Sequence, residues 1–182
     1  MKAVIQRVSE ASVTVEGKLK GYIDQGLLVY LGVAHDDNCK DADWLCDKII
    51  NLRILDDSDG VMNLSISGIV NQQNNMINTA VNLSGNPVND NLCKTGILVI
   101  SQFTLLADAR KGRRPSWNNA APTEKARELY EYFIIRVNDK GILCEYGEFQ
   151  ARMKVKYSNE GPVTILLDSK DKPEKNTKVC RA

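Results

Sequence analysis

The sequence predicts a single α/β domain. The chain has 182 residues, of which 43% are apolar and 26% charged, and this is enough to bury one full hydrophobic core. Some segments alternate apolar and polar residues with the period of a strand, and others repeat apolar residues at the spacing of a helix. We therefore expect strands and helices mixed along one chain around one core.

The first third of the chain predicts three strands. Ala3–Val8 is the first, and Ser12–Val15, with valines at alternate positions, is the second; a turn at Gly17 follows. Gly26–Val33 is a nearly continuous apolar run, and a strand that is apolar on both faces belongs in the middle of a covered sheet. Gly26–Val33 is therefore expected to be a central strand.

Two segments have helical periodicity. Asn38 can cap the first helix, on which Asp41 is expected to face water, and Pro122 can start the second, which ends at Asn138–Gly141. The apolar residues of the first are Ala42, Leu45, Cys46 and Ile49, and those of the second are Ala126, Leu129, Tyr130, Phe133, Ile134 and Val137. Each set shares one helix face, so each helix should pack on the core.

Residues 67–94 differ from their surroundings because they are rich in asparagine and almost uncharged. Such a polar tract cannot build a core of its own, so we expect an inserted loop with at most short local structure, which could still cover a site.

The remainder predicts further strands and a tail. Ile142–Tyr146 is one candidate, residues 151–158 are a second with a basic, wet face, and Gly161–Asp168 is the last. The basic face carries Arg152, Lys154 and Lys156. Residues 169–182 are basic and without apolar period, which predicts a solvated extension.

Several classes of chemistry lack the residues they need. The chain has one histidine, His35, and five cysteines with no C-x-x-C pair, so neither a zinc site nor a paired Ser-His or Cys-His site is indicated. Phosphate-loop and dinucleotide motifs are absent. The odd cysteine count, the lack of a secretion signal and the lack of a long apolar run predict a reduced, cytoplasmic protein with no membrane role.

The stretch ILVISQFTLLADARKGRRPSW, residues 97–117, carries the candidate chemistry. Ser101 and Gln102 end an apolar run, and the backbone amides of Phe103 and Thr104 can hold a developing oxyanion. The alternative is that these residues only satisfy local hydrogen bonds at a strand end. An alcohol without a base to activate it is a poor nucleophile, so the pattern favours hydrolysis of an already reactive ester.

A basic cluster follows directly, formed by Arg110, Lys111, Arg113 and Arg114. It is either a solvated loop or a phosphate-binding loop, in which Gly112 lets the backbone approach and Trp117 stacks on a base or sugar. The whole chain has 24 basic and 23 acidic side chains, so only such local clustering indicates a nucleic-acid partner.

The motifs SQFTL…ADARKGRRPS and NEGPVT, with the opening MKAVIQRVSEASVTVEG, resemble the D-aminoacyl-tRNA deacylases over residues 1–66 and 96–168. The resemblance implies a three-layer α/β/β domain over residues 1–168, with sheets curled into a partial barrel and two outer helices. Residues 67–94 are then an insertion and 169–182 an extension. It also implies a homodimer in the cytoplasm, without metal or cofactor.

The same resemblance implies a function and its residues. The substrate is the tRNA acceptor end carrying a D-amino acid, and hydrolysis is assisted by the 2′-hydroxyl of the RNA. Ser101, Gln102, Phe103 and Thr104 form the floor of the pocket. Gly161 and Pro162, joined by a cis bond, reach into the partner subunit's pocket and exclude L-amino acids, while some glycyl-tRNA is cleaved.

Two other functions stay open. A non-catalytic nucleic-acid-binding module would use the basic cluster, the basic strand face and the tail. A cysteine hydrolase would use His35 as its base and would be inactivated by thiol alkylation.

Overall fold

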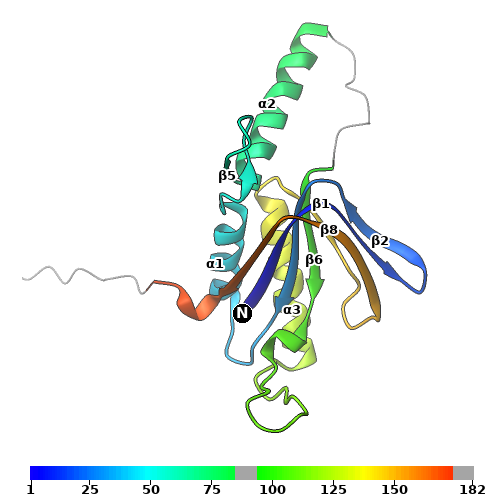
Figure 1. The fold of residues 1–182 in the computed structure, drawn as a ribbon, viewed down its shortest axis with the longest axis vertical. Helices are drawn as coiled ribbons and strands as arrows, with labels where there is room; N and C mark the ends of the chain where they lie inside the picture. The colour runs from blue at the N-terminus through cyan, green and yellow to red at the C-terminus, as the bar shows by residue number, and fades with distance from the viewer. Residues whose placement is uncertain (85–93, 174–182) are drawn as a thin grey trace, which may run out of the picture.

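The computed structural model describes residues 1–84 and 94–173, and most of its strands form one strongly curved sheet (Figure 1). Within these residues the sheet has six strands in the order β2-β1-β3-β6-β7, with β8 paired to β1. The strands are β1 (Lys2–Val15), β2 (Lys18–Ile23), β3 (Gly26–Gly32), β6 (Gly96–Ser101), β7 (Leu143–Tyr146) and β8 (Met153–Asp168). A separate antiparallel pair consists of β4 (Leu55–Asp56) and β5 (Met62–Leu64).

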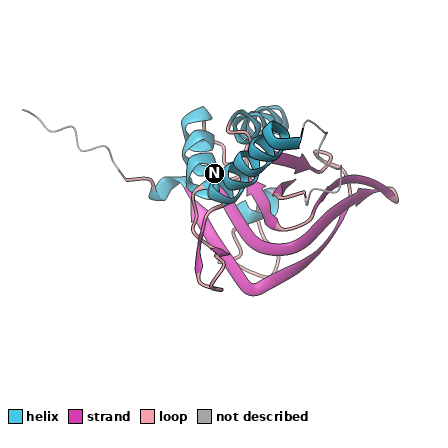
Figure 2. Cartoon of the chain, turned by 90° about the horizontal axis from the view of Figure 1, so that it is seen from above, coloured by secondary structure: helices cyan, strands magenta, loops and turns pink. Residues whose placement is uncertain are grey.

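The helices lie to one side of the curved sheet, as Figure 2 shows. They are α1 (Cys39–Ile50), α2 (Ile66–Ser84) and α3 (Thr123–Asp139), and the 3-10 helices are η1 (Phe103–Leu106) and η2 (Ser169–Asp171). β1 pairs antiparallel with β3, whereas β3 with β6 and β6 with β7 are parallel. Parallel neighbours need long crossovers, and the crossover from β3 to β6 includes α1 and that from β6 to β7 includes α3.

Apolar residues fill both faces of the sheet, as the predicted three-layer fold requires. The larger cluster lies between the sheet and the helices; it includes Phe133 and Cys46, both fully buried, so the prediction that Cys46 is a core residue is confirmed. The second cluster lies inside the curl and consists of Val8, Ala11, Val13, Ile23, Leu28, Leu98 and Ile100. β3 contributes to both clusters, which confirms the prediction of a central strand.

The predicted cap of α1 is present, but one detail was wrong. Asn38 accepts a hydrogen bond from the amide of Lys40 at 3.0 Å, and Asp41 accepts one from the amide of Asn38 at 3.0 Å, which forms a capping box. Asp41 is only 7% exposed and does not face water. Its carboxylate closes the box and also pairs with Lys172 at 2.7 Å.

We expected a loop over residues 67–94, and this was wrong for the part that ends at Ser84. Residues up to Ser84 belong to α2, which projects away from the sheet in Figure 1. Ser65 Oγ accepts a hydrogen bond from the amide of Gly68 at 3.2 Å, and Ile66 and Val70 are buried in the main core. A helix satisfies its backbone locally, so anchoring its first turns is enough for a polar sequence to continue as helix. Residues 85–93 lie outside the described residues.

Two expectations near the end of the chain also need correction. The predicted strands 151–158 and 161–168 are one strand, β8, whose register with β1 shifts twice between Gln6 and Glu10. The predicted extension does not begin in solvent, because Ser169 is fully buried and its amide donates to the carbonyl of Met1 at 2.8 Å. Residues 174–182 lie outside the described residues.

Candidate active site

The SQFT motif lies where the sheet ends and η1 begins. Ser101 is the last residue of β6, and the amide of Gln102 donates to the carbonyl of Leu31 at 2.8 Å. Phe103 and Thr104 open η1. Parallel β3 and β6 thus bring their carboxyl ends to one edge, the place where ligands commonly bind in α/β sheets.

A cavity of about 270 Å³ lies beside this motif. Ser101, Gln102 and Phe103 line it, whereas Thr104 is exposed and does not. The other lining residues come from β3, β6, α3, the start of β8 and the segments that follow β3 and precede α3 and β8. They are mostly apolar: Leu31, Val33, Ile100, Ala121, Ala126, Tyr130, Phe149, Gln150, Ala151, Met153 and Val155. The sequence motif therefore supplies much of the polar part of the cavity, and distant segments supply its apolar wall.

The SQFT motif offers hydrogen-bond donors but has no imidazole beside it to act as a general base. Gln102 Nε2 donates to the hydroxyl of Thr104. No side chain caps η1, and within the described residues the amides of Phe103 and Thr104 donate to no other group, as is usual in the first turn of a helix. Such amides can hold an oxyanion. His35 does not line this cavity, so no imidazole faces the motif.

Tyr130 and Phe149 form a fixed wall that sequence reasoning did not identify as part of a site. The hydroxyl of Tyr130 donates to the carbonyl of Val99 at 2.9 Å, and burial raises its pKa, so it stays protonated. Phe149 lies 5.7 Å from Tyr130 between ring centroids, with Arg127 4.8 Å above its ring. The helical pattern predicted that Tyr130 is buried, but nothing local indicated that it faces a cavity.

Gly161 and Pro162 lie in β8 where the register with β1 shifts, and the bond between them is cis. Both residues are exposed. Arg7, which is 8% exposed, donates through Nε to the carbonyl of Glu160 at 3.1 Å. Gly161 has φ +114°, and a Cβ there would lie 2.7 Å from Arg7 Nη2, so this position requires glycine.

Gly161 and Pro162 do not line the cavity beside Ser101 in the same chain. Ser101 pairs with Leu31, which pairs with Ala3, whereas Gly161 lies opposite Arg7. The motifs are therefore about 13 Å apart along β1 and three strand spacings, about 14 Å, apart across the sheet surface.

The basic cluster forms an exposed loop next to η1. All four of its side chains, Arg110, Lys111, Arg113 and Arg114, are exposed. Asp108 pairs with Arg110 at 2.6 Å, and this hydrogen bond lowers the pKa of Asp108. Trp117 does not extend freely into solvent, because its ring meets Phe103 edge-on with centroids 5.3 Å apart. This contact ties the basic loop to the SQFT motif.

Among the residues that the structure describes, the cysteines and acidic groups form no further centre. Within the described part of the chain, no group of His, Cys, Asp and Glu could hold a metal ion. Burial raises the pKa of Cys46 to about 11 and that of Cys144 to about 12, so both thiols are poor nucleophiles at neutral pH. No helix among the described residues is long and apolar enough to cross a membrane.

Known proteins resemble the chain over nearly its whole length. A D-aminoacyl-tRNA deacylase of Koribacter versatilis is 48% identical over 170 residues, covering 93% of this chain and 98% of the relative, and one of Kosmotoga olearia is 47% identical over 171 residues with the same coverage. The solved structure of a c-Myc DNA unwinding element binding protein has a TM-score of 0.74 and 35% identity, covering 92% of this chain and 98% of that one. A probable eukaryotic D-amino acid tRNA deacylase, 14% identical with a TM-score of 0.69, shares the fold.

A curled α/β domain with a cavity at the carboxyl ends of β3 and β6, together with relatives named D-aminoacyl-tRNA deacylases, identifies a hydrolase of the deacylase class. The matching family model covers residues 4–168. The chain belongs to the D-Tyr-tRNA(Tyr) deacylase family.

Proposed function

We propose that the chain hydrolyses the ester between a D-amino acid and the terminal adenosine of tRNA, releasing both. The cavity lined by Ser101, Gln102 and Phe103 carries this proposal, because it offers an ester a polar floor and an apolar wall. The family and its named relatives support the substrate class. We expect the protein in the cytoplasm, where charged tRNA is used.

In the proposed mechanism the RNA supplies what the protein lacks. The 2′-hydroxyl of the terminal ribose lies next to the ester and assists a water molecule, which bonds to the carbonyl carbon before the bond to the ribose oxygen breaks. The amide of Phe103, which lines the cavity, is proposed to hold the oxyanion formed between these steps, together with the next amide along η1, that of Thr104, at the rim. Such donors contribute roughly 2.7 to 4 kcal/mol each in other enzymes. No side chain needs to act as the nucleophile.

Selectivity is proposed to come from Gly161 and Pro162 of the partner subunit in a homodimer. The separation of the two motifs along the sheet supports this arrangement, because a second copy can bring its gate to a cavity that the chain's own gate does not line. β8 also exposes large apolar side chains, with Leu166 at 76% and Tyr157 at 40% exposure, which favours contact with another chain. Carbonyl oxygens at the gate would exclude an L side chain, while glycine offers nothing to exclude.

The exposed loop with Arg110, Lys111, Arg113 and Arg114 is proposed to hold the phosphates of the acceptor end. Its contact with Phe103 through Trp117 places it beside the cavity, which is where the RNA must enter.

The decisive assay compares hydrolysis of D-tyrosyl-tRNA, L-tyrosyl-tRNA and glycyl-tRNA by the purified protein. We expect fast cleavage of the D form, slower cleavage of glycyl-tRNA and none of the L form. Equal rates on the D and L forms, or none on the D form, would refute the proposal. Binding of tRNA without hydrolysis would support the alternative, a nucleic-acid-binding module.

Two variants of this assay address the mechanism. Thr104→Ala is expected to retain near-normal turnover, because the Thr104 amide remains; a loss of more than about a thousandfold would indicate a covalent role for its hydroxyl. A tRNA that ends in 2′-deoxyadenosine is expected to be cleaved far more slowly. Normal cleavage of that substrate would refute assistance by the RNA.

The gate has its own test. Sedimentation should show a dimer. A chain with a damaged gate should cleave both D- and L-tyrosyl-tRNA. Mixing it with a chain whose cavity is damaged but whose gate is intact should restore rejection of the L form, because the working cavity of a mixed dimer then faces an intact gate. Full rejection of the L form by a monomeric fraction would contradict the cross-subunit gate.

A further inference from the structure

A second cleft, of about 540 Å³, opens at the same edge of the sheet as the cavity beside Ser101. It is bounded by the start of β1, the segment after β3, the segment after η1, and the end of β8 with η2. η1 contributes Phe103 to the cavity and Leu106 to the cleft, so the two hollows adjoin across one short helix. The cleft is large enough for a ligand of nucleotide size.

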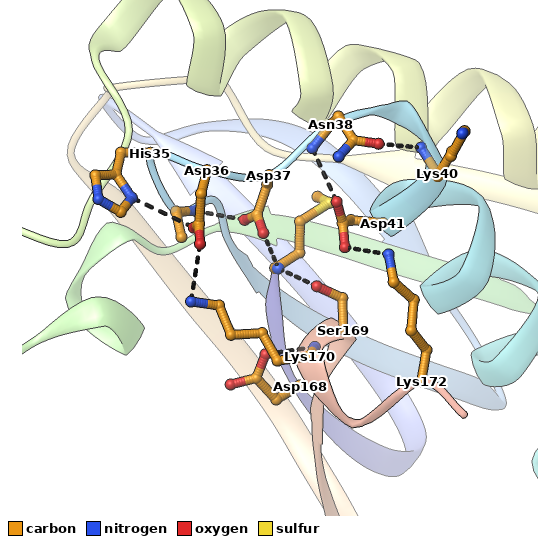
Figure 3. A network of polar contacts seen from close by, with 12 residues as sticks. His35, Asp36, Asp37, Asn38, Lys40, Asp41, Asp168, Ser169, Lys170 and Lys172 are labelled. Carbon is orange, nitrogen blue, oxygen red and sulfur yellow. Dashed lines mark hydrogen bonds and ion pairs between the residues drawn. The ribbon is translucent and has the colours of Figure 1, made fainter. Parts of the chain in front are cut away.

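The lining of the cleft is rich in charged and hydrogen-bonding groups. Lys170 pairs with Asp36 at 3.0 Å, as Figure 3 shows, and both side chains are more than half exposed. Lys2 is exposed, and within the described residues it forms no ion pair. His35 and Asn119 add further hydrogen-bonding groups to the lining.

Buried contacts fix the walls of this cleft. The amino group of Met1 donates to Asp37 and to the hydroxyl of Ser169, each at 2.5 Å, and all three groups are buried (Figure 3). The pair of Lys172 with Asp41 holds the end of η2 to α1. Lys170 therefore lies on a segment that is already ordered by buried contacts, and this reduces the entropy lost when a ligand binds.

We propose that this cleft binds the single-stranded nucleotides that precede the terminal adenosine of the substrate RNA. The inference rests on the proposed function, since an adenosine held beside Ser101 leaves the preceding nucleotides at the edge where the cleft opens. Lys2 and Lys170 can neutralise their phosphates, and the carboxylate of Asp168 can accept a hydrogen bond from a cytosine amino group.

The position of Arg110 supports RNA as the occupant. Arg110 lines the cleft and belongs to the exposed basic loop, so a strand that leaves the cleft meets Lys111, Arg113 and Arg114 next. Of the cationic side chains that line the cleft, Arg110 and Lys170 already pair with Asp108 and Asp36, whereas Lys2 pairs with no acidic group among the described residues. A bound phosphate therefore contacts Lys2 directly and competes with a carboxylate for each of the other two.

The test compares two esters, D-tyrosyl-tRNA and D-tyrosyl-adenosine, which lacks every preceding nucleotide. For Lys2→Glu and Lys170→Glu, we expect kcat/KM on the tRNA to fall about three- to tenfold more than kcat/KM on the adenosine ester. The slope of log(kcat/KM) against log salt on tRNA should also decrease by about 1 for each lysine. Lys48→Glu, an exposed α1 residue with the same charge change, is the matched control and should not alter the ratio.

The outcomes separate this inference from the proposed function. Failure of the unaltered protein to cleave either ester refutes the proposed function. If the lysine variants lose kcat/KM equally on both esters, or lose none on tRNA, the proposed role of the cleft in binding nucleotides is overturned. Binding of uncharged tRNA tests the cleft without hydrolysis. Lys170→Glu should weaken the binding of tRNA with an intact 3′ end but not the binding of tRNA from which the 3′-terminal single-stranded nucleotides have been removed. Equal weakening of both overturns the inference.

Discussion

Replacing the buried Arg7 with methionine should destabilise the protein by about 2 to 5 kcal/mol. The guanidinium group donates to the carbonyl of Ile54 at 3.1 Å, to the carbonyl of Glu160 at 3.1 Å and to Asp56 at 2.7 Å. Methionine keeps the apolar stem and removes all three bonds. The carbonyl of Ile54 would lose a buried partner, which costs about 1 to 3 kcal/mol, and the carbonyl of Glu160 a partly buried one, which costs about 1 to 2 kcal/mol.

The loss at Asp56 should add little, because its side chain is 43% exposed and water can replace the guanidinium. Urea unfolding followed by circular dichroism measures the effect. With a slope of about 2 kcal/mol per molar, the midpoint should fall by about 1 to 2.5 M. Arg7→Lys, which retains the charge but not the fork of donors, should give an intermediate value.

Arg53→Met is the matched control. Arg53 also donates to a backbone carbonyl, that of Asn63, at 2.8 Å, but it is exposed, so its replacement should change the free energy of unfolding by no more than about 0.5 kcal/mol. If Arg7→Met costs less than about 1 kcal/mol, or no more than the control, water replaces the guanidinium and the reasoning is wrong.

Three further predictions follow from the geometry. Asn38→Ala should lower stability by about 1 kcal/mol, or about 3 °C in a thermal melt, because α1 loses its cap; an unchanged melt would show that the cap contributes nothing. Gly161→Ala should cost about 1 to 3 kcal/mol in urea unfolding, because φ is +114° and the new Cβ would meet Arg7; an unaffected midpoint would contradict this strain. Burial raises the pKa of Cys46 to about 11 and that of Cys144 to about 12, so mass spectrometry should show that both thiols resist alkylation at pH 8. The free energy of unfolding should fall as pH rises above about 9, because the thiols of the unfolded chain ionise first. Rapid labelling, or stability that rises with pH, would refute this prediction.

Sequence reasoning succeeded where the signal is local and periodic. The apolar run of β3, the capped helix α1 and the helix after Pro122 were all predicted, because burial on one or both faces determines which residue types recur and at what interval. It failed for α2, where an asparagine-rich composition suggested a loop and the anchoring of Ile66 in the main core was not visible. It also divided β1 and β8 into two strands each and did not predict β2. In β8, Gly161-Pro162 resembles a break in pairing.

By itself, the sequence determined the central strand β3, the helices α1 and α3, and the family through its ordered motifs. Only the tertiary structure decided which distant segments complete the site. Arg7 and the carbonyl of Glu160 are 153 residues apart, and the cleft joins the start of β1, the ends of β3 and β8 and the segment after η1. Such groupings depend on strand order, register and curl, which arise from packing across the whole chain and leave no periodic trace in any short stretch.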